Sequence, residues 1–426
     1  MLLPVHGVGF VFFWMYPKKA GKVNSFISYM DFRKFTADHL FDGHKLLRDA
    51  VLITDEKGVV ESIVSTKDAG DDIRTFDGIL CPGFINCHCH LELSHLKDVI
   101  PPHTGLIEFL MSVVQKRGFE QEIVQEAIAR ADAEMYTNGI VAVGDICNTA
   151  DALPVKATSN IYWNNFIEVL SFTDELAADR FAHYNSVLGQ HKQLLPKKFR
   201  NVLSPHAPYT ISAKSFELIN EATKNQIISI HNQEHPAEDE LYKAGSGHFL
   251  KLLRIFGINT SPFPVTGKSS IRSYLPYFNN GQTILLIHNT YMPEEDIVFA
   301  NEHAKRNGLR LIYCLCVNAN RYIENTFPPV ELFVKHNCHI VLGTDSYSSN
   351  WQLDIAKEIN AVLGTTYFSA IPYMEALQTA LRWATINGAA ALEIQKDYGS
   401  FEKRKKPGIV LLENIQQKNL SARRVL

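Results

Sequence analysis

Several histidines and acidic residues in this 426-residue sequence are spaced in a way that suits metal-dependent chemistry. His88-Cys89-His90 stands at the end of an apolar run that contains Pro82-Gly83. Because side chains alternate between the two faces of a strand, His88 and His90 are expected to point the same way. Two adjacent imidazoles suit a Zn or Fe(II) site, although an HxH pair alone has low specificity.

Two further residues complete a candidate ligand set. His231 ends a later apolar run, and Asp345 ends another within the sequence GTDS. Three neutral imidazoles and one carboxylate leave a position for a bound water, as a catalytic rather than a structural site requires. The sequence therefore predicts one divalent transition metal, zinc being favoured over iron, held by His88, His90, His231 and Asp345.

The elements that must position these side chains are short apolar strands that alternate with amphipathic helical stretches. From residue 79 onward eight candidate strands occur, at 79–90, 140–147, 160–170, 201–209, 227–234, 283–290, 310–318 and 339–346. The stretches between them begin near Ser or Pro and end near Asn or Gly, as helices do. Eight successive βα units predict a (β/α)8 TIM-type barrel.

Polar side chains gather where these strands end: His88, His90, Asp145, Glu168, His206, His231, His288, Asn318 and Asp345. In a (β/α)8 barrel the carboxyl ends of the strands form the active-site face. The long connection at 235–282 is expected to shape the substrate pocket, and a helical excursion on the outside is the alternative.

The rest of the chain is assigned to smaller units. Residues 31–80 contain short β-type runs separated by Asp/Gly turns, which predicts a small antiparallel sheet, and the tail returns to β character. We expect a small β-sandwich domain from 30–80 and 395–426, beside a metal-dependent hydrolase barrel at 81–394. Residues 1–29 are expected to be an extension outside the fold, with an extra strand on the small domain as the alternative.

The composition and net charge limit the kinds of molecule that this protein is expected to bind. The net charge of -3 gives no field that would attract nucleic acid. The apolar run VGFVFFWMY is too short to span a bilayer and follows no basic segment, so neither a membrane span nor a signal peptide is expected. Seven cysteines without disulfide-scaffold spacing suggest reduced thiols. We expect a cytoplasmic protein that acts on a small-molecule substrate. Whether it forms a homodimer is left open by the sequence.

Five motifs together resemble the amidohydrolase superfamily: PGFINCHCH, SPHAPYT, HNQE, a strand-terminal His288 and GTDSYSSNWQLD. The branch they are most similar to contains cytosine deaminase, S-adenosylhomocysteine deaminase and chlorohydrolases, and the resemblance runs from about residue 31 to residue 415. It implies that His88, His90, His231 and Asp345 are metal ligands, that Glu234 is a proton-shuttling carboxylate, that His288 orients the attacking water or polarises the substrate, and that His206 contacts the substrate.

The sequence departs from the superfamily at two places. Binuclear members carry a carboxylated lysine on strand four, where this chain has His206, so one metal is favoured. Glu168 as a bridge to a second ion is the alternative. In the strand-seven segment CLCVNANRYI, Val317 replaces a proline, and Asn318 and Asn320 remain candidates for polar residues in the pocket.

Glu92, two residues after His90, either contacts substrate or caps the following loop. The candidate substrate-binding residues are therefore His206, Glu92 and Asn318.

The chemistry implied is hydrolysis of a carbon–nitrogen bond by metal-activated water. Asp345 takes the water proton, Glu234 protonates a ring nitrogen and His288 stabilises the tetrahedral intermediate. These three catalytic residues suit a deaminase of a purine nucleoside-like or other aromatic amidine substrate. An imidazolone- or formimino-type hydrolase or a chlorohydrolase is the alternative on the same site. A binding protein that has kept the barrel without catalysis is an alternative from another class.

Overall fold

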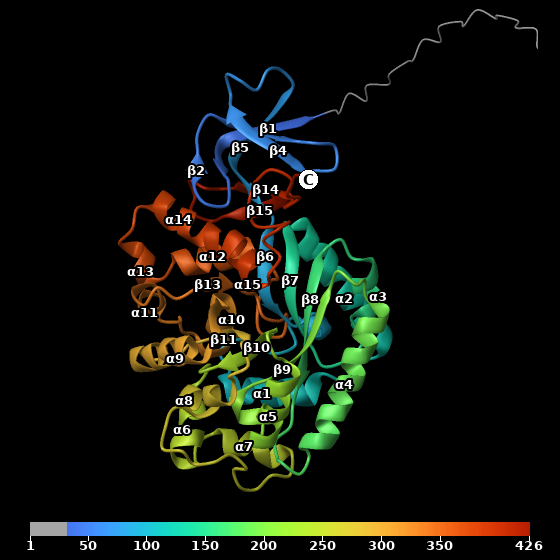
Figure 1. Cartoon of the computed structure of the whole chain (residues 1–426), viewed down its shortest axis with the longest axis vertical. Helices are drawn as coiled ribbons and strands as arrows, with labels where there is room; N and C mark the ends of the chain where they lie inside the picture. The colour runs from blue at the N-terminus through green and yellow to red at the C-terminus, as the bar shows by residue number, and fades with distance from the viewer. Residues whose placement is uncertain (1–31) are drawn as a thin grey trace, which may run out of the picture. The chain divides into compact units, whose positions relative to one another are not determined.

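The computed structural model describes residues 32–426 as an α/β fold in which parallel strands alternate with helices (Figure 1). The expectation for residues 1–29 therefore lies outside the described residues. All eight strands predicted from residue 79 onward are present: β6 (Phe84–Cys89), β7 (Ile140–Cys147), β8 (Tyr162–Val169), β9 (Arg200–Pro205), β10 (Ile227–Asn232), β11 (Thr283–His288), β12 (Arg310–Leu315) and β13 (Ile340–Leu342).

These strands form two four-stranded sheets, in the orders β6-β7-β8-β9 and β10-β11-β12-β13, and every neighbouring pair is parallel. Their sequences are nearly continuous apolar runs because both faces of such strands are covered. Every residue of β10 and β11 is buried. In the register of this pair Asn232 lies opposite His288, so His231 and His288 end neighbouring strands.

The predicted strand at 79–90 is in fact two strands. β5 (Ile73–Pro82) belongs to a different sheet from β6, and the chain changes sheet at Gly83. A Cβ atom at this glycine would lie 2.2 Å from Val141 Cγ1 and 2.6 Å from the Pro407 carbonyl oxygen. The backbone passes too close to its neighbours for any side chain here, so the change of sheet requires a glycine at this position.

The helices alternate with the parallel strands. The α-helices are α1 (Leu106–Lys116), α2 (Gln121–Thr137), α3 (Leu153–Thr158), α4 (Ala177–Leu194), α5 (Ala213–Ala222), α6 (Pro236–Ala244), α7 (Phe249–Ile255), α8 (Ser270–Tyr274), α9 (Glu294–Asn307), α10 (Val317–Glu324), α11 (Val330–Lys335), α12 (Ile355–Leu363), α13 (Thr366–Ser369), α14 (Tyr373–Arg382) and α15 (Gly388–Ala391). The short turns are η1 (Leu91–Leu96), η2 (Pro208–Thr210), η3 (Leu275–Tyr277) and the π-helical η4 (Trp383–Asn387).

Helix α5 begins, and helix α9 ends, at the kind of residue that the sequence predicts. The Ser212 side chain caps α5 by accepting a hydrogen bond from the Ser215 amide, and Gly308 ends α9 in a left-handed conformation with φ 67°. Within residues 32–426, no helix combines the length and apolar character that a bilayer crossing needs.

The strands outside the parallel sheets form one seven-stranded sheet: β1 (Arg33–Phe41), β2 (Leu46–Leu47), β3 (Ala50–Thr54), β4 (Val60–Ser65), β5, β14 (Ile409–Glu413) and β15 (Ser421–Arg424). This sheet was predicted to be antiparallel, but β1 and β5 pair in parallel. The antiparallel β3–β4 hairpin lies between them in sequence, and the chain then returns beside β1 in the original direction. β14 and β15 join the same sheet, so both ends of the described chain meet there.

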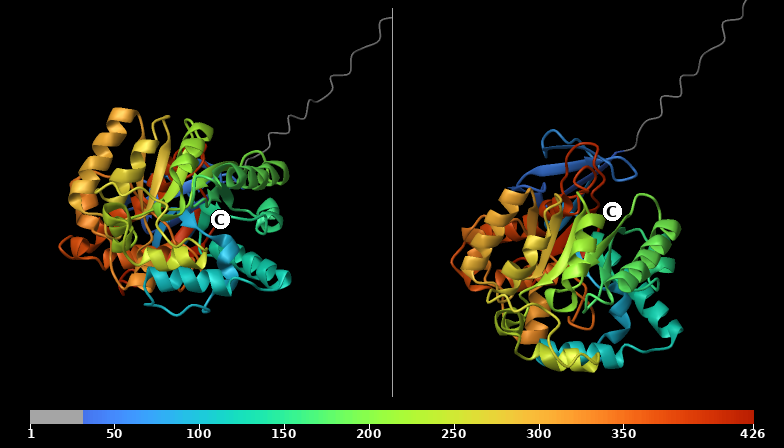
Figure 2. Two further views of the ribbon diagram at one scale, coloured as in Figure 1. Left: turned by 90° about the horizontal axis from the view of Figure 1, so that it is seen from below. Right: turned by 60° about the horizontal axis from the view of Figure 1, so that its bottom comes forward.

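A separate hydrophobic cluster covers the carboxyl ends of the parallel strands. α1 and α7, which are far apart in sequence, lie side by side there (Figure 2). Phe109 of α1 and Phe249 and Leu252 of α7 are buried in this cluster together with Tyr209. The connection at 235–282, which contains α6, α7 and α8, thus supplies part of a cap above the strand ends.

Candidate active site

A pocket opens at the carboxyl ends of the strands and brings most of the predicted site residues together. The polar residues that line it are His90, Arg117, Asn148, Glu168, His206, Thr210, His231, Glu234, His288, Asp345, Ser346 and Ser348. Glu92 and Asn318 do not line this pocket.

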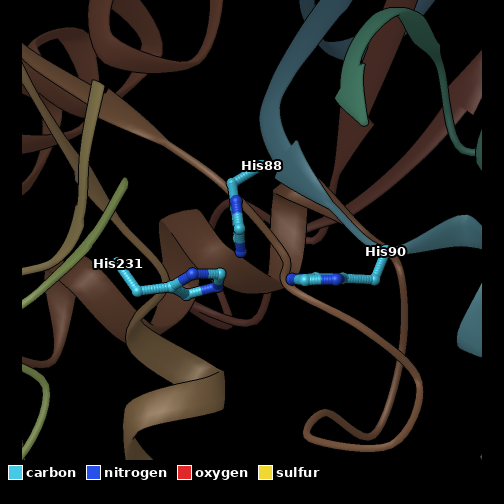
Figure 3. A group of neighbouring side chains, drawn as sticks. All are labelled: His88, His90 and His231. Atoms are coloured by element: carbon cyan, nitrogen blue, oxygen red, sulfur yellow. The ribbon is translucent and has the colours of Figure 1, made fainter. Parts of the chain in front are cut away.

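Three imidazoles converge beside the pocket, which two of them, His90 and His231, line. His88 and His90 come from the end of β6, His231 comes from β10, and their rings point toward one another (Figure 3). One ring nitrogen of each lies within 4.8 Å of the others. His88 is fully buried, and neither of its ring nitrogens has a hydrogen-bond partner within residues 32–426. Buried polar groups are normally hydrogen-bonded, so an unpartnered imidazole aimed at two others fits a metal ligand.

The protonation of these imidazoles also suits metal binding. His231 Nδ1 donates a hydrogen bond to the carbonyl oxygen of His206 at 2.8 Å, which leaves the Nε2 lone pair free. Burial lowers the pKa of His90 to about 3 and holds the pKa of His231 well below its usual range. Both rings are therefore neutral near pH 7, which is the state that binds a cation.

Asp345 follows β13, beside the end of β6, and its carboxylate faces the same imidazoles. Its Oδ1 lies 3.3 Å from His88 Nε2 and 3.4 Å from His90 Nε2, while Ser349 Oγ donates a hydrogen bond to Oδ2. Burial alone would raise the pKa of Asp345, but the nearby imidazoles outweigh that effect and hold the pKa well below its usual range. The amides of Thr344 and Asp345 both donate to the His88 carbonyl oxygen at 3.0 Å, which ties this carboxylate to the first strand.

Glu234 and His288 form the second functional pair. Glu234 Oε1 lies 3.5 Å from His288 Nε2. His288 Nδ1 donates to Asn320 Oδ1 at 2.9 Å, so Nε2 is the acceptor that faces the pocket. Burial, reinforced by the negative charge of Asp345, raises the pKa of Glu234 well above its usual range. A carboxyl group with a raised pKa keeps its proton near neutral pH and can serve as a general acid.

The backbone at two of these residues is unusual. His288 has φ 68° and Asp345 has φ 59°, a left-handed conformation that costs a residue other than glycine about 1–3 kcal/mol. Such strain is found where the surrounding structure imposes it, often at functional sites. His288 is the last residue of β11 and Asp345 follows β13, and both residues line the pocket.

Glu92 and Asn318 have other partners. The Glu92 carboxylate accepts hydrogen bonds from the Asn148 amide, the Thr149 amide and the Thr149 hydroxyl, so it caps the loop after β7. Asn318 lies in α10 rather than at a strand end, and its amide and side chain donate to Glu358. Because β12 ends at Leu315, the chain is already helical where strand continuation was predicted.

Sequence reasoning missed the apolar half of the pocket. It is lined by Leu106, Phe109, Leu110, Val113, Val114, Leu252 and Phe256, which come from α1, α7 and the residue after α7. The helical periodicity of LIEFLMSVV was the available signal, but a helix face pointing into a pocket looks like one that packs on a core. The roles of Ser349 and Asn320 in orienting Asp345 and His288 were missed as well.

A buried ion pair lies beside the site. Lys156 of α3 is fully buried, and its ammonium donates to the Asp145 carboxylate at the end of β7 and to Asn165 Oδ1. The second Asp145 oxygen accepts the Leu91 amide at 2.8 Å. Asp145 therefore anchors the backbone just after His90 and does not line the pocket.

Replacing Lys156 with methionine should lower the free energy of unfolding by about 3–5 kcal/mol, because it leaves the Asp145 charge buried without a partner. Arg130→Met is the matched control, since it removes an exposed helical pair with Glu126 that is worth about 0.5 kcal/mol. Chemical denaturation measures both changes. Similar losses in the two variants would contradict the structural role of Lys156.

Comparisons with known proteins agree with this arrangement. The model of the Amidohydrolase family matches residues 79–423. An adenosine deaminase of Helicobacter pylori is 26% identical over 78% of this chain and 78% of its own length. A 5-methylthioadenosine/S-adenosylhomocysteine deaminase of Thermoanaerobacter pseudethanolicus is 25% identical over 80% of this chain and 75% of its own. Helicobacter pylori aminofutalosine deaminase, solved with methylthio-coformycin, superposes with a TM-score of 0.76 at 22% identity, covering 91% of this chain and 95% of that one.

Proposed function

The chain belongs to the amidohydrolase family, and on this basis we propose that it is a hydrolytic deaminase of an adenosine-type nucleoside. In this reaction water supplies an oxygen to the ring carbon that carries the amino group, and that group leaves as ammonia. The observation that carries the proposal is the pair of Glu234 and His288, 3.5 Å apart, in the same pocket as the imidazole cluster. Relatives named as deaminases of adenosine and of its 5-methylthio derivative support the substrate class.

We propose that a single divalent metal ion is held by His88, His90, His231 and Asp345. The unpartnered His88, the neutral His90 and His231 and the ionised Asp345 all support this ligand set. Zinc is favoured over iron because nitrogen and oxygen donors with one open position suit catalytic zinc. When bound, such an ion supplies Lewis acidity that lowers the pKa of water toward neutrality.

Two carboxyl groups of the chain carry out the proton transfers of this reaction, and a histidine orients the water. Asp345, with its lowered pKa, is the base that accepts a proton from water, and Ser349 holds the carboxylate in place. Glu234, with its raised pKa, donates a proton to a ring nitrogen and so makes the neighbouring carbon more electrophilic. His288 presents Nε2 to the attacking water and orients it.

The finer architecture is part of the same proposal. We propose that β6 to β13 close into one (β/α)8 barrel at 81–394, and that 30–80 and 395–426 form a β-sandwich domain. Backbone hydrogen bonds bridge both seams between the two parallel sheets: the His231 amide donates to the His206 carbonyl, and the Asp345 amide donates to the His88 carbonyl. The homodimer and the cytoplasmic location remain predictions from the sequence.

The purified protein should release ammonia from at least one of adenosine, methylthioadenosine, S-adenosylhomocysteine and aminodeoxyfutalosine. The adenine-to-hypoxanthine change in absorbance follows the reaction directly, and detection of ammonia confirms the leaving group. Turnover of only guanine, a formimino amino acid or a chlorotriazine would overturn the substrate assignment. Family membership does not depend on this result.

A further inference from the structure

A row of three serine side chains runs from Asp345 to the pocket. Ser346, Ser348 and Ser349 follow β13 and are all buried, and the first two line the pocket. Ser349 Oγ donates a hydrogen bond to Asp345 Oδ2 at 2.5 Å. Ser346 Oγ lies 3.0 Å from Ser349 Oγ and 2.5 Å from Ser348 Oγ. All three distances are within hydrogen-bond range, so the hydroxyl groups form one continuous chain.

The turn after β13 uses only two of these hydroxyl groups. Ser349 Oγ accepts a hydrogen bond from the Ser346 amide at 3.3 Å, and Ser346 Oγ accepts one from the Ser348 amide at 3.2 Å. The Ser348 hydroxyl, by contrast, has no hydrogen-bond partner within residues 32–426 other than Ser346 Oγ. A hydroxyl group can donate once and accept twice, so Ser348 keeps hydrogen-bonding capacity for a group in the pocket.

The direction of this chain of hydrogen bonds depends on Asp345. A hydroxyl group has one hydrogen, and that of Ser349 is closer to the carboxylate, at 2.5 Å, than to the Ser346 carbonyl oxygen, at 3.2 Å. Ser346 then donates to Ser349, Ser348 donates to Ser346, and the free lone pairs of Ser348 make it an acceptor toward the pocket. When Asp345 carries a proton on Oδ2, every hydrogen bond reverses and Ser348 becomes a donor.

The proposed reaction has one proton transfer for which no residue has been named. Glu234 donates a proton to a ring nitrogen, and Asp345 accepts one from water. The amino group must also gain a proton in order to leave as ammonia. Asp345 Oδ1 faces the imidazoles of His88 and His90, so Oδ2, which contacts Ser349, is the oxygen that leads away from them.

We propose that Ser349, Ser346 and Ser348 relay the proton that Asp345 takes from water to the departing amino group. This inference rests on the proposed function. Ser348 gives its hydrogen to the amino nitrogen, which keeps the electron pair of the breaking carbon–nitrogen bond and leaves as ammonia. Each serine regains a proton from the next group in the chain, and Asp345 returns to its ionised form. The second hydrogen of the water restores the proton of Glu234, so atoms and charges balance.

The test compares two leaving groups on the same ring carbon. One substrate is the nucleoside that wild type deaminates fastest, and the other is its analogue with chlorine in place of the amino group. Chloride leaves as a stable anion and needs no proton, whereas ammonia needs one. Ser346→Ala and Ser348→Ala should therefore lower kcat for ammonia release by about 10²-fold, while chloride release stays within a few-fold of wild type.

Two further measurements separate a relay from a structural role. Ser346→Ala interrupts the chain but leaves the hydrogen bond between Ser349 and Asp345 in place, so elemental analysis should find the wild-type metal content. Ser348→Thr keeps a hydroxyl group at the end of the chain, so it should retain most of the ammonia release.

Ser215→Ala is the matched control. Ser215 is buried, its hydroxyl oxygen lies 3.1 Å from that of Ser212, and neither residue lines the pocket. The variant loses a buried hydrogen bond between two serines without touching the chain at Asp345. Its release of ammonia and of chloride should both stay within a few-fold of wild type.

Three results would overturn the inference and leave the proposed deaminase function standing. Full ammonia release by both alanine variants would show that no proton passes through these serines. An equal loss of ammonia and chloride release would reduce them to supports of the site. A Ser348→Thr enzyme as inactive as Ser348→Ala would show that the hydroxyl group is not what matters. Failure of wild type to deaminate any nucleoside is a separate outcome, which would overturn the proposed function and this inference with it.

Discussion

Replacing His231 with alanine should abolish metal binding and reduce kcat/KM by roughly 10³-fold or more, since several kcal/mol of transition-state stabilisation are lost with the ion. His231 supplies one of the three imidazoles of the cluster, and three ligands hold a transition metal far less well than four. Elemental analysis should find about one divalent ion per wild-type chain and much less in the variant. Chelation of the wild-type protein should reproduce the loss of activity, and added metal should restore it.

His191→Ala provides the control for removing a buried histidine. His191 of α4 is fully buried, and its Nδ1 donates to the Val187 carbonyl oxygen at 3.0 Å, much as His231 Nδ1 donates to a backbone carbonyl. Its variant should lose stability but keep the metal. If wild type contains no transition metal and its activity survives chelation, the proposed ligand set is wrong.

Glu234→Gln should keep the metal while kcat falls by about 10²–10⁴-fold, the usual contribution of a general acid or base. The amide preserves the shape and the polarity of the side chain but cannot transfer a proton. Glu234 is buried, and its Oε1 faces His288 Nε2 rather than the imidazole cluster, so the variant should leave the metal ligands undisturbed. Steady-state kinetics and elemental analysis on the same preparation separate the two effects.

Glu238→Gln is the matched control, because Glu238 lies four residues further along, is fully buried and also has a pKa raised by burial, to about 8. Its carboxyl group accepts hydrogen bonds from Ser270 and from the Gln233 amide and does not line the pocket. This variant should stay within a few-fold of wild type. A Glu234→Gln enzyme that is equally active would reduce Glu234 to a structural residue.

The parallel strands could be predicted because their signal is local. Each is a short apolar run, and consecutive runs are separated by helical stretches, which only a parallel arrangement accommodates easily. Where a strand's partners lay elsewhere in the chain, prediction failed. The parallel pairing of β1 with β5 joins segments about 40 residues apart, and the change of sheet at Gly83 brings the backbone against Val141 and Pro407. No local pattern reveals either contact.

The candidate site also has features that the sequence predicts and features that depend on contacts distant in sequence. The side chains at the strand ends could be predicted to share one face from the chain alone, because parallel βα units bring all carboxyl ends together whatever the details of packing. That placement predicts His88, His90, His231, His288 and Asp345 on one face, and the resemblance to the amidohydrolase superfamily adds Glu234. It is not sufficient for Glu92 and Asn318, which also follow predicted strands but bind a loop and a helix.

Which polar groups share the pocket, and in which protonation state, depends on the packed fold and could not be predicted from local patterns. The lowered pKa of His90 and the raised pKa of Glu234 result from burial among residues distant in sequence. The same is true of the apolar wall that α1 and α7 build together. Desolvation and side-chain contact depend on the complete packed surroundings of a group, whereas apolar periodicity depends only on neighbours along the chain.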